Sequence, residues 1–566
     1  MRKRKMKEKW IATFLCAATA AGLLAGCGNT DASDQASAGA TDTVELTAPG
    51  ELPIVNEKIE LSALVVQLPY KLTDVKTNEF TIELEDMTNV HLNMTVVPQD
   101  SYQEKLNLLL ASGDYPDIIM SGGFSNADLV KYGSEEKILI PLNDLIEEQG
   151  YYIKERFEEF PNLKSDMTAP DGNIYGIPGN IGGSVGHEAV GYKMWINTKW
   201  LENLGLEKPT TTEEFYQVLK AFKEQDANGN GDPNDEIPLT GATGTWAGEP
   251  YLFLLNAFGY YTTDAVMLKD GKMYPTANTE AMKEGLEYIH KLYEEGLIDP
   301  AAFTQNESQL SAVGNNEGSN IVGAVSCGHI GMAVSINDEE RMSEFTALEP
   351  LEGPNGYRGI PFTEELRFSG ATYVITDKCE YPEVAFRLAD TLMKEDVALR
   401  SCIGQKGKYW DDADEGTFGS DGVTPARYKY LQMVAGNDGT TANDLWELTC
   451  CLVMPKDWKT WFQVEGSIYD PNNYEARLLQ ETEKLRPYAA DVDQIPPFYM
   501  NDEDSTALAQ ISSPLQDYIK QSIIEFITGK KDIESGWEEY LTGLSNLKYE
   551  EYVDLYQKAY DELSHQ

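Results

Sequence analysis

Hydrophobic and polar positions in the first third of the chain repeat with two periods, one typical of strands and one typical of helices. Strands are expected at residues 59–66, 90–97 and 117–120, and helices at 78–87 and 102–110. Strands that alternate with helices predict a parallel sheet in an α/β lobe. Because ligands bind at the carboxyl ends of such strands, residues 121–125 form either a ligand-facing loop or a simple Gly-rich turn.

A second set of periodic segments begins near residue 192. Strands are expected at 192–197 and 372–376, and helices at 200–205, 279–295, 382–394, 514–528 and from 538 onward. Thr211 and Glu214 have the spacing of a capping box, and Phe215, Val218, Leu219 and Phe222 then follow on one helical face. The pattern therefore predicts a second α/β lobe.

The N-terminus has the pattern of an export signal. Basic residues precede an apolar run over 10–24, and Leu24-Ala25-Gly26-Cys27 follows. A Cys at this junction is typical of bacterial lipoproteins, in which it is acylated; an ordinary signal peptide is the alternative. The apolar run is shorter than a spanning helix, so the mature chain is expected to be anchored by lipid on Cys27. Residues 27–56, poor in aromatic side chains, are expected to form a flexible tether.

Composition narrows the possible partners. The 566 residues carry a formal net charge of −48, which repels nucleic acid and anionic membranes. After Cys27, five cysteines remain without metal-binding spacing, namely Cys327, Cys379, Cys402, Cys450 and Cys451. Most are expected to be buried thiols, although up to two disulfides are compatible with this number.

The sharpest chemical motif runs from residue 226 to residue 236. Oxygen-bearing side chains at loop positions 1, 3 and 5, followed by Gly231, match the first half of a calcium loop. The candidate ligands are Asp226, Asn228, Asn230, Asp232 through its carbonyl, Asp235 and Glu236. Ile237 stands where an EF-hand has its closing Glu, so the last ligands must approach differently. We expect a structural calcium ion here; the alternative is a metal-free Asn-Gly turn.

Other apparent motifs are weaker. Residues 182–186 match a GxSxG nucleophile pattern, but a Gly/Pro-rich stretch precedes them where a strand is required. The five histidines are scattered without a metal-binding spacing. An acidic run at 411–415 fits a solvated turn better than a second cation site. No residue is therefore assigned a catalytic role.

Several segments together resemble the extracellular solute-binding proteins (family 1) of bacterial ABC carbohydrate importers, in the lipoprotein branch with a calcium loop. They are the junction at Cys27 and residues 111–118, 171–178, 200–238, 527–533 and 556–561. The calcium loop is one residue longer than usual for that family at 232–234, which leaves the role of Asp232 open. The resemblance extends over the whole chain.

The resemblance implies a two-lobed α/β fold of the type II periplasmic-binding-protein class, with several hinge crossings. Residues 57–180 and 370–490 would form one lobe, and residues 190–365 and 495–566 the other. The ligand would be an oligosaccharide held between the lobes, and the partner an ABC permease in the membrane. A monomer on the outer face of the cell membrane of a Gram-positive-type bacterium is expected, with calcium as its cofactor and no enzymatic activity.

Sugar recognition in such a cleft would use aromatic faces and carboxylates. The candidate ligand-binding residues are Phe124, Trp246, Glu249, Trp410 and Trp446, each of the tryptophans having a packed core position as its alternative. Two other functions stay open at this stage: a surface-anchored glycan-degrading enzyme, and a receptor for peptides or uronides on the same scaffold.

Overall fold

The computed structural model describes residues 44–67, 74–179, 186–432, 443–446, 450 and 452–564, without the side chains of Asp100, Asp502 and Ser564. The lipidation site Cys27, most of the expected tether, the GxSxG motif and Cys451 lie outside these residues. The chain divides after Val44, and the description below concerns the unit from Glu45 onward. In the described residues, no helix combines the length and the apolar character needed to cross a bilayer.

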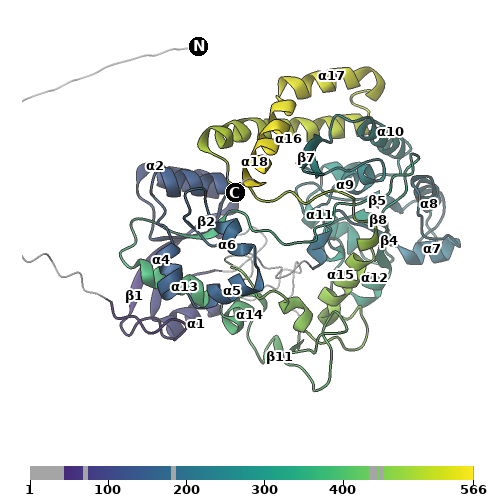
Figure 1. The fold of residues 1–566 in the computed structure, drawn as a ribbon. Coiled ribbons are helices and arrows are strands. Elements are labelled where there is room, and N and C mark those ends of the chain that lie inside the picture. Colours follow the sequence, from purple (N-terminus) through teal and green to yellow (C-terminus); the bar gives the residue numbers. More distant parts are fainter. Residues whose placement is uncertain are drawn as a thin grey trace, which may run out of the picture. The chain divides into compact units, whose positions relative to one another are not determined.

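Strands and α-helices alternate at the start of this unit, and its C-terminal part is helical (Figure 1). The strands are β1 (Ile59–Gln67), β2 (Val90–Pro98), β3 (Ile118–Phe124), β4 (Met194–Asn197), β5 (Ile237–Thr240), β6 (Val266–Lys269), β7 (Lys272–Pro275), β8 (Val322–Ser326), β9 (Phe345–Ala347), β10 (Ala371–Ile375), β11 (Trp410–Asp412) and β12 (Tyr428–Tyr430). The first α-helices are α1 (Glu79–Thr88), α2 (Gln99–Ser112), α3 (Asn126–Leu129), α4 (Asn143–Gln149), α5 (Tyr152–Glu159), α6 (Leu163–Met167), α7 (Thr198–Leu204), α8 (Thr212–Glu224) and α9 (Pro250–Leu254). The later ones are α10 (Glu280–Glu294), α11 (Glu307–Gly314), α12 (Glu339–Ser343), α13 (Pro382–Leu392), α14 (Glu395–Ile403), α15 (Tyr474–Glu483), α16 (Asp502–Ile527), α17 (Ile533–Asn546) and α18 (Tyr549–Ser564).

The first sheet has the strand order β10-β3-β1-β2. Both β2 and β3 are parallel to β1, as the alternation of strands and helices predicts, whereas β10 joins β3 in the antiparallel sense. β10 returns to this sheet from more than 240 positions further along the chain, which no local pattern encodes.

The second sheet has the order β5-β8-β4-β9 and mixes both orientations. β5 and β8 are parallel, and β4 is antiparallel to its neighbours β8 and β9. The largest apolar core lies with this sheet; α8 contributes to it through the face that the helical spacing predicts, and α10 contributes through Met282, Leu286, Ile289 and Leu292. Residues 211 and 214 form the expected capping box at the start of α8.

The candidate loop at 121–125 is different from its prediction. Ser121, Gly122 and Gly123 continue β3 instead of leaving it, and Phe124 pairs with Ala371 of β10. Positive φ angles at Ser121 and Gly123 accompany a register shift in this pair. Pairing with a strand that arrives much later in the chain therefore extends β3 through the segment expected to be a loop.

The helix expected at 514–528 begins twelve residues earlier, at Asp502. Pro514 lies inside α16, where it leaves one backbone acceptor without its usual donor. The buried side chains Ile511, Leu515 and Ile519 lie on one face and continue the apolar stripe through the proline. Packing of this stripe, which contacts α10, outweighs the local cost of Pro514.

The cysteines that the structure describes are free thiols, and all but the half-buried Cys379 are buried. Among the described residues, Cys327, Cys379, Cys402 and Cys450 are all free. Burial raises the pKa of Cys379 and of Cys450 to about 12, so both stay protonated at neutral pH.

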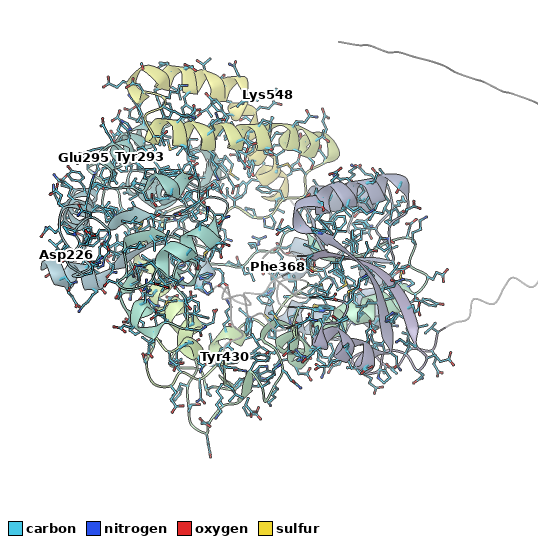
Figure 2. All side chains as sticks on the ribbon, turned by 180° about the vertical axis from the view of Figure 1, so that it is seen from behind. Asp226, Tyr293, Glu295, Phe368, Tyr430 and Lys548 are labelled. Carbon is cyan, nitrogen blue, oxygen red and sulfur yellow. The ribbon has the colours of Figure 1, made fainter. Side chains whose placement is uncertain are left out.

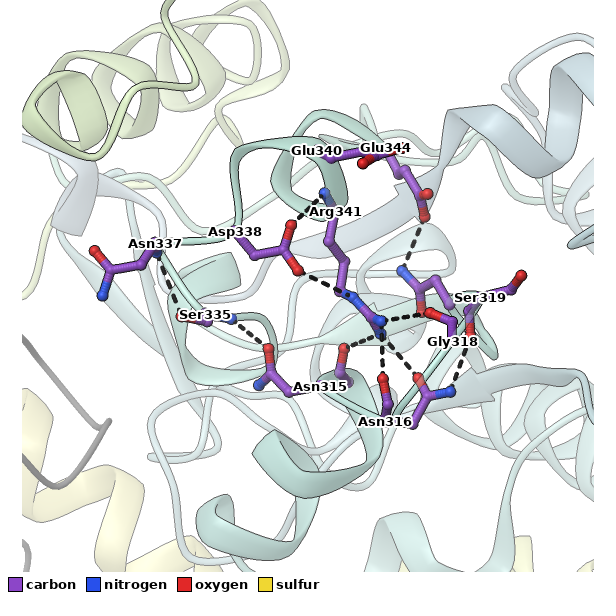
Figure 3. Close-up of polar contacts among 12 residues, drawn as sticks. Asn315, Asn316, Gly318, Ser319, Ser335, Asn337, Asp338, Glu340, Arg341 and Glu344 are labelled. Carbon is purple, nitrogen blue, oxygen red and sulfur yellow. Dashed lines mark hydrogen bonds and ion pairs between the residues drawn. The ribbon is translucent and has the colours of Figure 1, made fainter.

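An arginine hub stabilises the loop that follows α11 (Figure 3). The Arg341 guanidinium donates to the carbonyl oxygens of Gly314, Asn316 and Gly318 at 2.8–2.9 Å, and to Oδ1 of Asn316 at 2.8 Å. Asp338 caps the start of α12 and lies 3.5 Å from Arg341 Nε. One planar side chain thereby satisfies several carbonyls of an irregular loop, a role that lysine cannot fill.

Candidate functional site

Two Gly-rich segments lie directly before and after β5, and both carry predicted site residues. Residues 226–236 precede the strand and contain the calcium motif. Residues 241–249 follow it and contain Trp246 and Glu249.

The second segment presents an aromatic face to solvent. Trp246 is 40% exposed, although it is a large apolar side chain. Gly328 N donates to Trp246 O at 3.0 Å and fixes the backbone of the segment. A Cβ atom on Gly328 would lie 2.0 Å from the indole ring, and one on Gly191 would lie 3.3 Å from its Nε1. The two glycines thus provide the flat backing on which the indole rests.

Two histidine rings also border the indole. The ring centroids of His187 and His329 lie 6.1 and 6.2 Å from that of Trp246. His329 Nδ1 lies 2.9 Å from the Tyr474 hydroxyl. Burial is the largest cause that lowers the pKa of His329, to about 3, so this ring is neutral at physiological pH.

Lys193 lies behind the same segment and is completely buried. Its ammonium donates to the carbonyl oxygens of His187, Val190 and Gly328, and lies 5.8 Å from the centroid of the Trp246 ring. Burial lowers the pKa of Lys193 to about 7. This single amine therefore ties the segment before β4 to the glycine that supports Trp246.

A charged cluster surrounds His187 on the other side. Lys459 Nζ bonds Glu188 Oε1 at 2.6 Å and lies 3.3 Å from Glu475 Oε2, which also lies 3.3 Å from His187 Nδ1. Burial alone would raise the pKa of Glu475, but Lys459 and His187 outweigh it and hold this pKa well below its usual range. The cluster brings together three distant parts of the chain: η2 (His187–Ala189), η7 (Trp458–Trp461) and α15.

Trp246 and Glu249 line one cavity of about 510 Å³. Its wall combines aromatic and polar side chains, including Tyr192, Tyr251, Thr263, Gln516, Asp517 and Lys520. Glu249 is buried, and its Oε1 accepts from Lys520 Nζ at 2.6 Å and from Thr243 Oγ1 at 3.3 Å. An aromatic face beside hydrogen-bonding side chains is suited to a polyhydroxylated ligand.

The other three candidate ligand residues lie elsewhere and are buried. Trp446 packs edge-on against Phe80, and its Nε1 donates to Thr81 Oγ1 at 2.8 Å. Trp410 begins β11 instead of lying in a loop, and its Nε1 donates to Gly404 O at 2.8 Å. Phe124 packs edge-on against Tyr132 in the core of the first sheet. In the described residues, the structure therefore brings together only Trp246 and Glu249 of the five.

The calcium motif forms a closed loop of side-chain oxygens. Oxygens of Asp226, Asn228 and Asn230 accept from the backbone N–H groups of Gly231, Asn230 and Asp232 at 2.7–2.9 Å. Asp235 accepts from the amides of Asn228 and Asn230, and Glu236 Oε1 accepts from Ala227 N. Gly229 and Gly231 have the positive φ values that so tight a turn requires.

Two oxygens of this loop are left without a partner. Asp226 Oδ1 and Glu236 Oε2 are buried, and neither has a hydrogen bond within the described part of the chain. Desolvated carboxylate oxygens of this kind fit a hard cation. No three Asp, Glu, His or Cys side chains of the described residues are grouped as a metal site, so amide and backbone oxygens would have to complete the shell. Asp226 begins this loop, and Figure 2 shows it well apart from Phe368, which precedes β10 of the first sheet.

The family is decided by comparison with known proteins. The family model described as "Bacterial extracellular solute-binding protein" matches residues 75–398. The chain belongs to this family. Such proteins are the extracellular binding components of ABC importers, not enzymes, and the fold is the two-lobed α/β fold that the resemblance implies. The hypothesis of a glycan-degrading enzyme is therefore wrong.

Two similar proteins and one solved structure are informative. The fructooligosaccharide ABC transporter substrate-binding protein FusA of Streptococcus pneumoniae serotype 4 is 30% identical over 514 residues, which cover 90% of this chain and 91% of FusA. Lipoprotein LipO of Bacillus subtilis is 30% identical over 63% of this chain and 64% of its own. A solved structure of a FusA EF-hand mutant with fructo-nystose has a TM-score of 0.75 at 28% identity, covering 89% of this solute-binding protein and 99% of that chain.

Proposed function

We propose that this solute-binding protein captures a neutral oligosaccharide on the exposed face of Trp246. The observation that carries the proposal is the half-exposed indole, backed by Gly328 and Gly191, at the wall of a cavity that also contains Glu249. The C–H face of a sugar ring would stack on the indole, and Glu249 with Lys520 would bind its hydroxyl groups. The name of FusA and the ligand in its solved structure support an oligosaccharide as the ligand class.

Ligand held between the two lobes would stabilise the closed state, because only that state lets both lobes contact it. From the first lobe, Phe124, Trp410 and Trp446 would contact the ligand only after a rearrangement that exposes their packed side chains. The lobe boundaries predicted from the sequence are likewise a proposal. One refinement is supported by α15, which falls in the predicted first lobe but packs against β9 of the second sheet.

The N-terminus would anchor the protein near the membrane importer to which it delivers the ligand. Acylation of Cys27 would hold the protein at the outer face of the membrane, close to the ABC permease that takes up the ligand. The name of the relative LipO supports a lipoprotein. Metabolic labelling with a fatty-acid analogue should label the wild-type protein and not Cys27→Ala.

We further propose that one calcium ion binds the loop at 226–236 and stabilises the second lobe. Asp226, Asn228, Asn230, Asp235 and Glu236 would supply side-chain oxygens, with the carbonyl of Asp232 as a further donor. The two buried carboxylate oxygens without partners support this assignment, and so does the EF-hand in the name of the FusA variant. The positive charge of the ion would bind these desolvated oxygens and thereby stabilise the folded loop.

The experiment is isothermal titration calorimetry with fructo-nystose, a neutral oligosaccharide of another type, an oligogalacturonide and a short peptide. We expect a neutral sugar to bind the wild type, and Trp246→Ala to lose at least about 2 kcal/mol, roughly 30-fold in Kd. Trp537→Phe is the matched control, because Trp537 is 6% exposed and does not line the cavity. Binding of the peptide or uronide alone, or unchanged affinity in Trp246→Ala, would overturn the proposal.

A further inference from the structure

The cavity at Trp246 does not end at Lys520. A second cavity of about 470 Å³ is lined by Asp517, Lys520, Gln521, Ile524, Glu525 and Lys530, and shares Asp517 and Lys520 with the first. The two spaces are therefore adjacent along α16. We call the second one, defined by these six residues, the α16 groove.

One face of α16 forms the floor of the groove, and the buried opposite face holds this helix in place. Asp517, Gln521 and Glu525 follow one another at intervals of four and lie on one face of α16. The opposite face, with Ile519, Ile523 and Phe526, is buried in the core. At 1.5 Å per residue, the row from 517 to 525 is about 12 Å long, which is longer than a single sugar ring. Because the buried face holds the helix, its backbone needs no ordering when a ligand binds, and only the side chains of the row lose freedom.

The chemistry of the groove is polar and nearly balanced in charge. Two carboxylates, Asp517 and Glu525, face two ammonium groups, Lys520 and Lys530. Gln521 Nε2 donates to Glu525 Oε1 at 3.0 Å, and Lys520 pairs with Glu249 at the boundary between the cavities. The side chains of Asp517 and Lys530 line the groove, so their polar atoms can reach a ligand bound in it. A balanced set of donors and acceptors suits hydroxyl groups better than an anion.

We propose that the α16 groove is a subsite for the distal units of a neutral oligosaccharide whose first unit lies on Trp246. The inference rests on the proposed function and extends it, because it predicts that longer oligosaccharides bind more tightly than short ones. Gln521, Glu525 and Lys530 would bind hydroxyl groups of units beyond the one on the indole. These three residues would raise the affinity for long oligosaccharides only, whereas Trp246 would raise the affinity for oligosaccharides of every length.

The test measures Kd for fructooligosaccharides from the disaccharide to the pentasaccharide. We expect the wild-type affinity to rise with length, and the double variant Gln521→Ala/Lys530→Ala to lose about tenfold, ~1.4 kcal/mol, for the longest ligands only. Gln510→Ala is the matched control, since Gln510 is an exposed amide on α16 outside both cavities. It should bind every length like the wild type.

The outcomes separate this inference from the proposed function. If short and long ligands bind with equal affinity, or if the double variant weakens all of them alike, the subsite is wrong and the proposed function stands. If neither this series nor the other neutral oligosaccharide binds, the proposed function itself fails, and this inference fails with it. Tighter binding of an oligogalacturonide than of a neutral chain of equal length would also overturn the inference, because the groove would then select acidic sugars.

Discussion

The two Gly-rich segments on either side of β5 are built in opposite ways. The loop at 226–236 before the strand is held by its own residues: oxygens of Asp226, Asn228 and Asn230 accept from backbone N–H groups two to five positions further along the chain. The Trp246 segment after the strand is held from outside, by Gly328, Gly191 and Lys193. A self-contained loop can be predicted from its own sequence, whereas a platform assembled from distant segments cannot.

The largest expected effect concerns the self-contained loop. Removing calcium with a chelator should lower the free energy of unfolding by about 2.7 kcal/mol when free calcium had stood at 100 times its Kd. Differential scanning calorimetry measures this loss, and Asp226→Ala should abolish the response to the chelator. An unchanged melting temperature in wild type would show that the loop needs no ion.

A second prediction concerns the glycines that support the platform, which is the Trp246 segment at residues 241–249. Gly328→Ala adds one methyl group 2.0 Å from the indole, so Trp246 must move and its sugar contact should weaken by ~2 kcal/mol, about 30-fold in Kd. Gly191→Ala, where the new Cβ would meet Nε1 at 3.3 Å, should have a smaller effect. Calorimetric titration compares both variants. Equal affinities in both variants and wild type would contradict external support of the platform.

The charged cluster behind the platform gives it a pH response. The pKa of Glu475 is depressed in the folded state, so its contribution to stability is present above the ordinary carboxyl pKa and is lost as the pH falls below it. Between about pH 5 and pH 3, wild type should lose more stability than Glu475→Gln, and at neutral pH the variant should be less stable by ~1.5 kcal/mol. Urea denaturation across this range provides the measurement, and parallel curves would exclude the ion pair as the cause.

The smallest effect is expected at Gly231, because no atom packs against it, whereas the indole packs directly on Gly328. Gly231 has φ of +94° and no neighbour within 4 Å of a Cβ, so Gly231→Ala should cost only about 1 kcal/mol of backbone strain. Stability and calcium affinity should fall slightly, and sugar affinity should not change. Thermal melts with and without calcium test this, and a large loss of sugar binding would show that the two segments are coupled.

Much of the fold could be predicted from periodic patterns. The strands of the first sheet and the α8 capping box were confirmed, because alternation and capping residues are local signals. The start of α16 and the end of β3 were wrong, because packing against α10 and pairing with β10 decide them. Trp246 could be singled out as an aromatic residue in a Gly-rich segment. Lys193 could not, since nothing in the sequence predicts that its ammonium joins two nearby carbonyls to that of Gly328, 135 positions further along the chain.

The two faces of α16 are under different constraints. Ile519, Ile523 and Phe526 are packed in the core, so almost any polar change there would cost the protein its stability. Gln521 and Lys530, by contrast, can be exchanged at the surface with little penalty to folding. Related proteins could thus acquire a preference for longer or shorter sugars by mutating a few surface positions of one helix. The preferred length of the bound sugar would then evolve on the exposed face of α16, while packing in the core constrains its buried face.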